Sequence, residues 1–131
     1  MELEAEGLTL RLKHAERALR RALDPLLSAE GLTFEHWQVL AALLERPGLR
    51  MTDLAEFAVI PAATLTRHVD RLVERALVIR RIDPADKRRA VVALSSLGHT
   101  FAERLRDAER DTPTPGPPHP RATVASGDRD L

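Results

Sequence analysis

Residues 77–94 place two β-prone runs on either side of a short turn, and this hairpin pattern constrains the fold more than any other feature of the chain. Isoleucine, valine and leucine supply the strand positions, and Asp83-Pro84-Ala85-Asp86 has the composition of a turn. Five basic residues stand against two acidic ones, which gives the hairpin a formal charge of +3. The basic residues are Arg80, Arg81, Lys87, Arg88 and Arg89. An exposed tip of this charge predicts a β-wing that contacts the phosphates of nucleic acid.

The segment before residue 32 has the periodicity of an amphipathic helix. Its apolar residues recur at spacings of 4, 3, 4, 3 and 4, and they are Leu8, Leu12, Ala15, Leu19, Ala22 and Leu26. Pro25 can kink this helix near its end, and Gly31 is a natural stop. Periodicity leaves two alternatives open: the helix packs only on its own core, or it also pairs with a second subunit.

Two further helices are predicted between residues 33 and 58. Thr33 is suited to cap the first, and Leu32 and Trp37 stand at the positions of a hydrophobic staple. The apolar residues that follow predict a central, buried helix, in which Trp37 is a core anchor rather than a ligand platform. The second helix is short and is predicted to run from Thr52 to Ala58, with Thr52 as its N-cap.

The next elements complete a recognisable arrangement. Pro61 opens a fourth helix, at a position where its missing N–H costs nothing, and this helix runs to Ala76 or Leu77. Two helices joined by a short turn and followed at once by a hairpin make a winged helix-turn-helix. Ser95 then caps a last helix. The predicted fold class is therefore α+β, mainly α with a small β-hairpin. The predicted ranges are 1–31 for the N-terminal helix, 32–95 for the winged helix-turn-helix domain, 96–110 for the C-terminal helix and 111–131 for a disordered Pro-rich tail.

Composition excludes several classes of protein. The chain of 131 residues fits one globular domain, and its formal net charge of zero excludes a uniformly basic coat for DNA. The absence of cysteine excludes disulfides, cysteine-ligated zinc and thiol redox sensing. No apolar run approaches the roughly 18 residues of a membrane span, and the N-terminus is acidic where a signal peptide would be basic. We therefore expect a cytoplasmic protein with no membrane partner.

Enzymatic chemistry is not indicated. The sequence has no Gly-rich phosphate loop, no Ser/His/Asp order and no HExxH pattern. Its five histidines lie far apart in the sequence. Its Asp and Glu residues have the charge-pair spacing of solvent-exposed helix surfaces. We predict no catalytic residue, no cofactor and no metal site.

The helix that Pro61 opens carries the better candidates. Its solvent face begins with Ala62, Ala63, Thr66 and Arg67. Small residues at the start let the backbone come close to base edges, and the threonine and the first arginine can then reach into the major groove. Arg71 and Arg75 follow, where phosphate contact is favoured over base readout. The alternative is that these arginines form ion pairs along the helix, such as Arg67 with Asp70 or Arg71 with Glu74.

The tip of the hairpin adds a second set of candidates. One residue separates Asp86 from Arg88, so the carboxylate can brace the guanidinium. A braced arginine loses less entropy when it enters a narrow, strongly negative minor groove. Lys87 and Arg89 would flank it as phosphate contacts. The alternative is a solvated tip with a local salt bridge.

Several runs of this sequence resemble the MarR (multiple antibiotic resistance regulator) family of bacterial transcription factors. They are Leu54-Ala55-Glu56, Thr64-Leu65-Thr66-Arg67-His68-Val69-Asp70-Arg71-Leu72, Ala76-Leu77-Val78 and the run from Asp86 through Val92-Ala93-Leu94-Ser95 to Gly98. The resemblance covers roughly residues 8–110. It implies a homodimeric repressor or activator of transcription, with its recognition helix in the major groove of double-stranded DNA and Arg88 in the minor groove. It also implies that the flanking helices dimerise and that a small aromatic or phenolic effector relieves DNA binding.

The chain departs from the family pattern in three respects. Pro61 stands where the family usually has a serine N-cap, and Val59 replaces the usual turn glycine. Ala76 replaces the glycine after the recognition helix and tolerates a left-handed cap poorly. The C-terminal helices are expected to be cut short near Arg110 and replaced by the tail. Dimerisation then rests on the first helix and a shortened fifth, or the dimer is altered.

Two sets of site residues follow. The predicted DNA contacts are Thr52, Pro61, Ala62, Ala63, Thr64, Thr66, Arg67, His68, Arg71, Arg81, Asp86, Lys87, Arg88 and Arg89. The predicted dimerisation residues are Leu8, Leu12, Ala15, Leu19, Phe101 and Leu105. An alternative function is a winged-helix interaction module, or a heterodimer partner with impaired DNA binding of its own. The shortened C-terminal layer and the zero net charge motivate this alternative.

Overall fold

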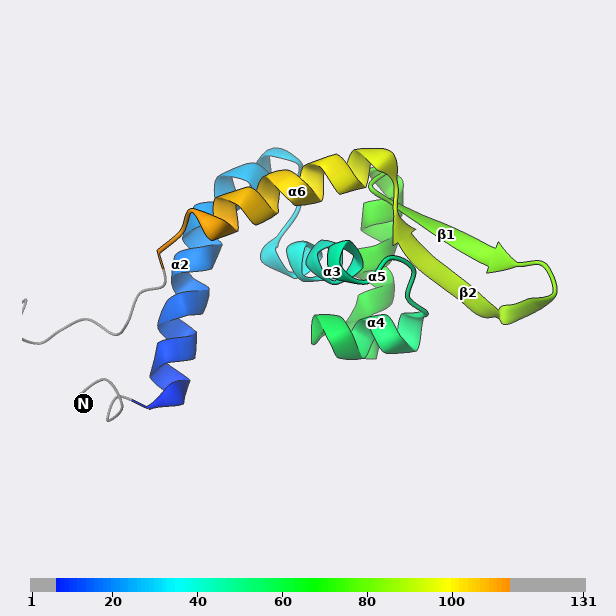
Figure 1. Cartoon of the computed structure of the whole chain (residues 1–131), viewed down its shortest axis with the longest axis horizontal. Coiled ribbons are helices and arrows are strands. Elements are labelled where there is room, and N and C mark those ends of the chain that lie inside the picture. The colour runs from blue at the N-terminus through cyan, green and yellow to red at the C-terminus, as the bar shows by residue number, and fades with distance from the viewer. Residues whose placement is uncertain (1–6, 114–131) are drawn as a thin grey trace, which may run out of the picture.

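The computed structural model describes residues 7–113, apart from the side chains of Asp83 and Lys87 (Figure 1). Its elements are α2 (Leu8–Ala29), α3 (Phe34–Glu45), α4 (Met51–Ala58), α5 (Ala62–Glu74), β1 (Val78–Asp83), β2 (Asp86–Leu94) and α6 (Ser96–Arg110). α6 runs from α2 to the base of the β1–β2 hairpin, and the hairpin projects away from the body formed by α3, α4 and α5 (Figure 1). The predicted fold class is confirmed. Most of the predicted tail, residues 114–131, lies outside the described residues.

The two halves of α2 have different surroundings. The helix continues through Pro25, and its buried side chains, Leu23 and Leu27, belong to its C-terminal half. The N-terminal half extends beyond the other helices (Figure 1), so Leu8 and Leu12 are 64% and 57% exposed. The C-terminal half therefore packs on the core of its own chain, while the N-terminal half leaves an apolar stripe uncovered.

The core of the chain is centred on α3, which packs against α2, α4, α5, α6 and β2. Its side chains Trp37, Leu40 and Leu43 are buried, which confirms Trp37 as a core anchor. The indole N–H of Trp37 donates to Glu109 Oε1 at 3.2 Å, near the end of α6. A buried indole N–H needs such a partner, and this one fastens α6 over the core.

Two side chains of α6 that were expected at a dimer interface lie inside this core instead. Phe101 is 6% exposed and Leu105 is 0% exposed. A side chain that its own chain already covers has no surface left for a second subunit. The role predicted for Phe101 and Leu105 is therefore corrected from dimerisation to core packing.

Three helices end in the same way, with one residue in the left-handed backbone region. The residues are Gly31 (φ 70°), Val59 (φ 60°) and Ala76 (φ 61°). The next residue is apolar and buried in each case, and its N–H returns to a carbonyl five residues back; the pairs are Leu32 with Leu27, Ile60 with Ala55, and Leu77 with Leu72. The stop predicted at Gly31 is confirmed. Val59 and Ala76 adopt the same geometry although their Cβ atoms crowd the following carbonyl oxygen.

Replacing Val59 with glycine is expected to stabilise the protein. Valine is β-branched, and this side chain is 79% exposed, so it gains little packing to offset left-handed strain. Glycine gives the unfolded chain more conformational entropy, which opposes folding, but relief of the backbone strain is the larger effect. We therefore expect the free energy of unfolding to rise by about 1 kcal/mol. Urea unfolding followed by circular dichroism measures the change. Val59→Thr keeps the β-branch and should give no gain; a Val59→Gly variant no more stable than wild type would contradict the strain.

The hairpin is anchored at its base and free at its tip. β1 and β2 pair in antiparallel register with one irregularity between Arg81 and Asp83, and the turn predicted at residues 83–86 is confirmed. In the α3–α4 connection, Leu49 exchanges both backbone hydrogen bonds with Val92 of β2, at 3.0 and 2.8 Å. This extra bridge holds the base of the wing to the body, so the wing extends from a fixed point.

Two helix starts differ from the prediction. α4 begins at Met51 with Arg50 in the N-cap position, and Thr52 is an exposed residue of the first turn. The prediction of Thr52 as the N-cap was therefore wrong. Pro61 occupies the N-cap position of α5 rather than its first helical position, and its carbonyl accepts the N–H of Leu65 at 3.0 Å. An N-cap residue also needs no N–H of its own, so the shift by one residue carries no penalty.

The start of α6 packs directly on the end of α5. Ser95 caps α6 as predicted: its Oγ accepts the N–H of Gly98 at 2.9 Å and donates to the Ala76 carbonyl at 2.6 Å. The Ser95 N–H donates to the Leu77 carbonyl at 3.0 Å. Gly98 lies so close that a Cβ atom there would come within 1.8 Å of the same Leu77 oxygen. This junction fixes α6 relative to both α5 and the wing.

Candidate nucleic-acid interface

Helix α5 has one buried and one exposed face. Leu65, Val69 and Leu72 are at most 1% exposed and attach the helix to the core. The exposed residues are Ala62, Ala63, Thr66, Arg67, Asp70 and Glu74. Because the first of these side chains are small, a DNA duplex can approach the backbone at the start of α5.

Arg67 is an exposed cation on this face. It makes no side-chain hydrogen bond or ion pair with any other residue between 7 and 113. Asp70, its alternative partner in the sequence, pairs instead with Arg80 of β1. Thr64 has a local role, since its hydroxyl donates to the Pro61 carbonyl at 3.1 Å. The guanidinium of Arg67 is therefore available to a ligand.

The tip of the wing contains the expected brace between Asp86 and Arg88. Asp86 Oδ1 accepts from the backbone N–H of Arg88 at 3.0 Å and from its Nε at 3.3 Å. The Arg88 side chain is nevertheless 90% exposed. One edge of the guanidinium is thus oriented by the carboxylate, while its terminal nitrogens face solvent.

The other arginines of the wing divide into two roles. Arg80 turns back to α5 and pairs with Asp70, which ties the wing to the helix. Arg81 and Arg89 are exposed, and their side chains contact no partner within the described part of the chain. Two separate basic surfaces, the start of α5 and the outer wing, are therefore held in a fixed relation.

Three basic side chains, two of α5 and one of its C-cap residue, turn toward the α2–α3 corner, which we define as residues 30–36. They are His68, Arg71 and Arg75. Arg75 forms an ion pair with Glu30 at 2.7 Å, and Arg71 donates to the Gly31 carbonyl at 3.4 Å. Nδ1 of His68 lies 3.3 Å from Nε2 of His36. Two of the predicted DNA contacts, His68 and Arg71, are thus half-buried against the corner rather than on the exposed face.

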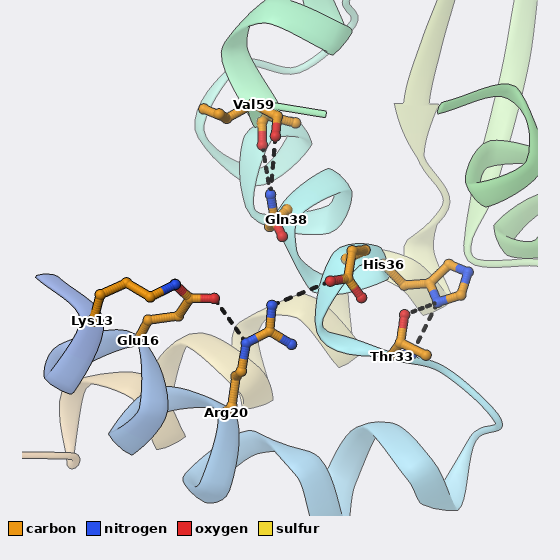
Figure 2. Close-up of polar contacts among 9 residues, drawn as sticks. Lys13, Glu16, Arg20, Thr33, His36, Gln38 and Val59 are labelled. Atoms are coloured by element: carbon orange, nitrogen blue, oxygen red, sulfur yellow. Dashed lines mark hydrogen bonds and ion pairs between the residues drawn. The ribbon is translucent and has the colours of Figure 1, made fainter. Parts of the chain in front are cut away.

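His36 is a functional candidate that the sequence analysis missed. It is 7% exposed, and its Nδ1 accepts the backbone N–H of Thr33 at 2.9 Å (Figure 2). This is the reciprocal bond of a capping box, with histidine in place of the usual Glu or Gln, and it confirms Thr33 as the cap. Burial, and next the nearby charges of His68 and Arg71, lower the pKa of His36 to about 4. His36 is therefore neutral at physiological pH.

Charged residues join α2 to α3 on the side away from the wing (Figure 2). Lys13 lies 3.5 Å from Glu16, Glu16 lies 2.9 Å from Arg20, and Arg20 lies 3.2 Å from Glu35. The hydrogen bond from Arg20, followed by the charge of Lys13, lowers the pKa of Glu16. Exposed pairs of this kind contribute little energy, and of these three only the Arg20–Glu35 pair joins the two helices.

Gln38 holds the turn between α4 and α5. Its Nε2 donates to the Ala58 carbonyl at 3.0 Å and to the Val59 carbonyl at 3.4 Å (Figure 2). These are carbonyls that the end of α4 leaves without helical partners. The contact therefore positions the turn that precedes α5. A lone glutamine on a largely apolar helix was its signal in the sequence.

An aromatic groove lies between α3 and α4. Its volume is about 220 Å³, and it is lined by Phe34, Trp37, Gln38, Ala41, Ala42, Glu45, Phe57 and Ala58. Apolar walls with a few polar groups are the usual make-up of a site for a small organic ligand. Among residues 7–113 no group of three or more acidic, histidine or cysteine side chains could hold a metal ion. Nor is any helix in that range long and apolar enough to cross a membrane.

Sequence comparison finds relatives among regulators of transcription. A sequence model described as MarR family matches residues 30–89, which include α3, α4, α5 and the tip of the wing. Transcriptional regulator HosA of Escherichia coli O111:H- is 42% identical over 67 residues, which are 51% of this chain and 50% of HosA. The HTH-type transcriptional regulator FarR of Neisseria gonorrhoeae is 31% identical over 99 residues, 76% of this chain and 68% of FarR. The chain thus spans half the length of HosA and about two thirds of FarR.

Structure comparison gives the same arrangement of helices and wing. The crystal structure of NadR in complex with 4-hydroxyphenylacetate matches with a TM-score of 0.67 and 29% sequence identity. The match covers 76% of this chain and 71% of NadR.

Proposed function

Because this chain belongs to the MarR family of transcriptional regulators, we propose that it binds double-stranded DNA as a homodimer, through α5 and the basic wing. The observation that carries the proposal is the placement of Arg67 and Arg88. Both guanidinium groups are exposed, on neighbouring elements that the Asp70–Arg80 pair ties together. With no net charge on the whole chain, attraction to DNA depends on these local surfaces.

The two surfaces suit different grooves. The start of α5 enters the major groove, where Thr66 and Arg67 reach base edges; arginine pairs well with O6 and N7 of guanine. The wing lies over the adjacent minor groove with Arg88 inserted, because a braced guanidinium loses little entropy there. Arg81 and Arg89 then contact phosphates. The side chain of Lys87, the other predicted phosphate contact, lies outside the described part of the structure. A protein of this kind acts on transcription by occupying its operator, and it performs no chemistry of its own.

Dimerisation would use the apolar stripe on the N-terminal half of α2. Leu8 and Leu12 are exposed there, and Ala15 and Leu19 are half-buried beside them. A second copy would cover the stripe and supply a second recognition helix and wing. The expected operator is then a pseudo-palindrome whose half-sites lie about one DNA turn apart.

Arg88→Ala tests the minor-groove contact. We expect operator binding to weaken by roughly 1 to 3 kcal/mol if Arg88 contacts bases, and by less if only a phosphate contact is lost. The operator is selected from random DNA with the purified chain, and affinity is then measured by fluorescence anisotropy at several salt concentrations. Arg110→Ala is the matched control, since it removes the same charge from an exposed site on α6. Full affinity in Arg88→Ala would contradict the wing assignment.

The same selection distinguishes the alternative function. A chain that recovers no DNA alone and is monomeric by mass, yet binds DNA with a related partner, would be a heterodimer subunit or interaction module. The observation behind this alternative is the uncovered stripe on α2, which a related chain could also occupy. The two exposed arginines favour direct DNA binding.

We propose in addition that a small aromatic acid relieves DNA binding. Two observations support this: the groove between α3 and α4 is lined by Phe34, Trp37 and Phe57, and NadR, a structural neighbour, is known in complex with 4-hydroxyphenylacetate. A ligand in this groove would contact Gln38, which holds the turn before α5. Addition of 4-hydroxyphenylacetate to the anisotropy assay shows whether DNA is released.

A further inference from the structure

The recognition helix is attached to the α2–α3 corner by three contacts that follow one stripe of α5. The residues of the stripe, His68, Arg71 and Arg75, are spaced by three and four positions and so share one helix face. The two arginine contacts, to Glu30 and to the Gly31 carbonyl, are only partly buried, and each contributes little. The third contact, between His68 and the buried His36, lies deepest and is nearest to the DNA-facing start of the helix.

Hydrogen bonding fixes the protonation of both histidines. Nδ1 of His36 accepts the backbone N–H of Thr33, so this nitrogen carries no proton and the neutral ring has its proton on Nε2. Nε2 lies 3.3 Å from Nδ1 of His68, and the rings meet edge to face with an interplanar angle of 85°. Nε2–H therefore donates to an unprotonated Nδ1 of His68. A proton added to Nδ1 of His68 would remove the acceptor of this hydrogen bond.

We propose that His36 and His68 are positioning residues that form a proton-sensitive joint between the α2–α3 corner and the recognition helix, so that mild acid weakens DNA binding. The proposal rests on the proposed DNA-binding function. A proton on Nδ1 of His68 would face the Nε2–H of His36, which places two donors against each other. A proton on His36 could go only to Nδ1, where the Thr33 N–H already points. Either event replaces an attraction with a repulsion and frees the start of α5.

The surroundings of His36, taken together, favour its neutral form. Arg71 from α5 and Glu35 from α3 face His36, and Thr33 contributes only neutral groups. Burial and the positive neighbours outweigh Glu35, and the pKa of His36 falls to about 4 from an ordinary value of 6.5. The folded protein thus favours neutral His36: its contribution is complete above pH 6.5 and is lost as the pH falls toward 4.

The test compares pH profiles of the full chain and of His68→Gln. Glutamine at this position can still accept from His36 Nε2–H through its carbonyl oxygen but does not titrate near neutral pH. Operator affinity is measured at pH 7.5 and 5.5, at constant ionic strength and with chelator present. We expect wild-type affinity to fall about tenfold across this range. The ratio of the affinities at the two pH values should be much smaller for His68→Gln, whatever the affinity of that variant at pH 7.5. His99→Gln, at an exposed site on α6, should keep the wild-type profile.

A second measurement does not depend on DNA. Nitrogen-15 shifts of the imidazole rings report the tautomers, and hydrogen exchange reports protection of the Thr33 amide. We expect Nε2–H on His36 and a protected Thr33 amide at pH 7.5. At pH 5.5 we expect protection, corrected for the intrinsic exchange rate, to be reduced in wild type and kept in His68→Gln. If wild type binds no DNA at pH 7.5, the proposed function fails while this measurement still tests the joint. Equal pH profiles of wild type and His68→Gln in both assays would overturn the joint. So would a rise in melting temperature on adding zinc that His68→Gln abolishes, since the pair would then be a metal site.

Discussion

Gly98→Ala should lower the free energy of unfolding by about 3 kcal/mol or more, although alanine is the better helix former. A Cβ at this position would lie 1.8 Å from the Leu77 carbonyl oxygen, far inside contact distance. That oxygen belongs to the backbone and accepts the Ser95 N–H, so it cannot rotate away as a side chain would. Overpacking of this severity exceeds the usual cost of an added methyl group, and α6 must shift from the end of α5.

The sign of the change makes the Gly98→Ala experiment decisive. Helix propensity alone would make the variant more stable by about 1 kcal/mol, so the two effects predict opposite directions. Thermal or urea unfolding followed by circular dichroism measures the difference. Ser96→Ala, at an exposed position one residue after the cap, is the control and should stay within about 0.5 kcal/mol of wild type. A stabilised Gly98→Ala would show that α6 and Leu77 are not in close approach.

Features that depend on neighbouring residues could be predicted from the sequence. The Asp86–Arg88 brace spans two positions, and the cap of α6 at Ser95 spans three, so short-range spacing contains the necessary information. The hairpin and the stop at Gly31 follow from turn chemistry for the same reason. The fold class could be inferred because the order of these local elements is itself diagnostic.

Contacts between distant residues could not be predicted in this way. Thirty-two positions separate His36 from His68, and the spacing of histidines along the chain gives no sign that the rings meet. Periodicity identified the apolar stripe of α6 correctly, but the partner that covers a stripe depends on how the helices pack. Phe101 was assigned to a second subunit for that reason, although the core of its own chain covers it. Val59 illustrates a third limit, since tertiary packing imposes a backbone geometry that its residue type disfavours.

Alanine substitutions at Leu105 and Leu12 should distinguish core packing from dimerisation. Both residues are leucines in helices, but one is buried in the core and the other is exposed. Leu105 is 0% exposed, and Leu105→Ala should lower the free energy of unfolding by about 3 kcal/mol through lost burial and the cavity left behind. Leu12 is 57% exposed within one chain, so Leu12→Ala should change the stability of the folded monomer by less than about 0.5 kcal/mol.

The expected effect of Leu12→Ala appears instead in association. A two-fold interface uses the same patch twice, so one substitution removes two buried leucines, each worth roughly 1.5 kcal/mol when truncated. We expect the dissociation constant of the dimer to rise by about a hundredfold, measured by sedimentation equilibrium, while Leu105→Ala leaves it unchanged in the fraction that stays folded. Because two DNA half-sites are bound together only by a dimer, operator affinity should fall in Leu12→Ala at protein concentrations below the new dissociation constant. An unchanged dimer in Leu12→Ala would move the subunit contact away from the N-terminal half of α2.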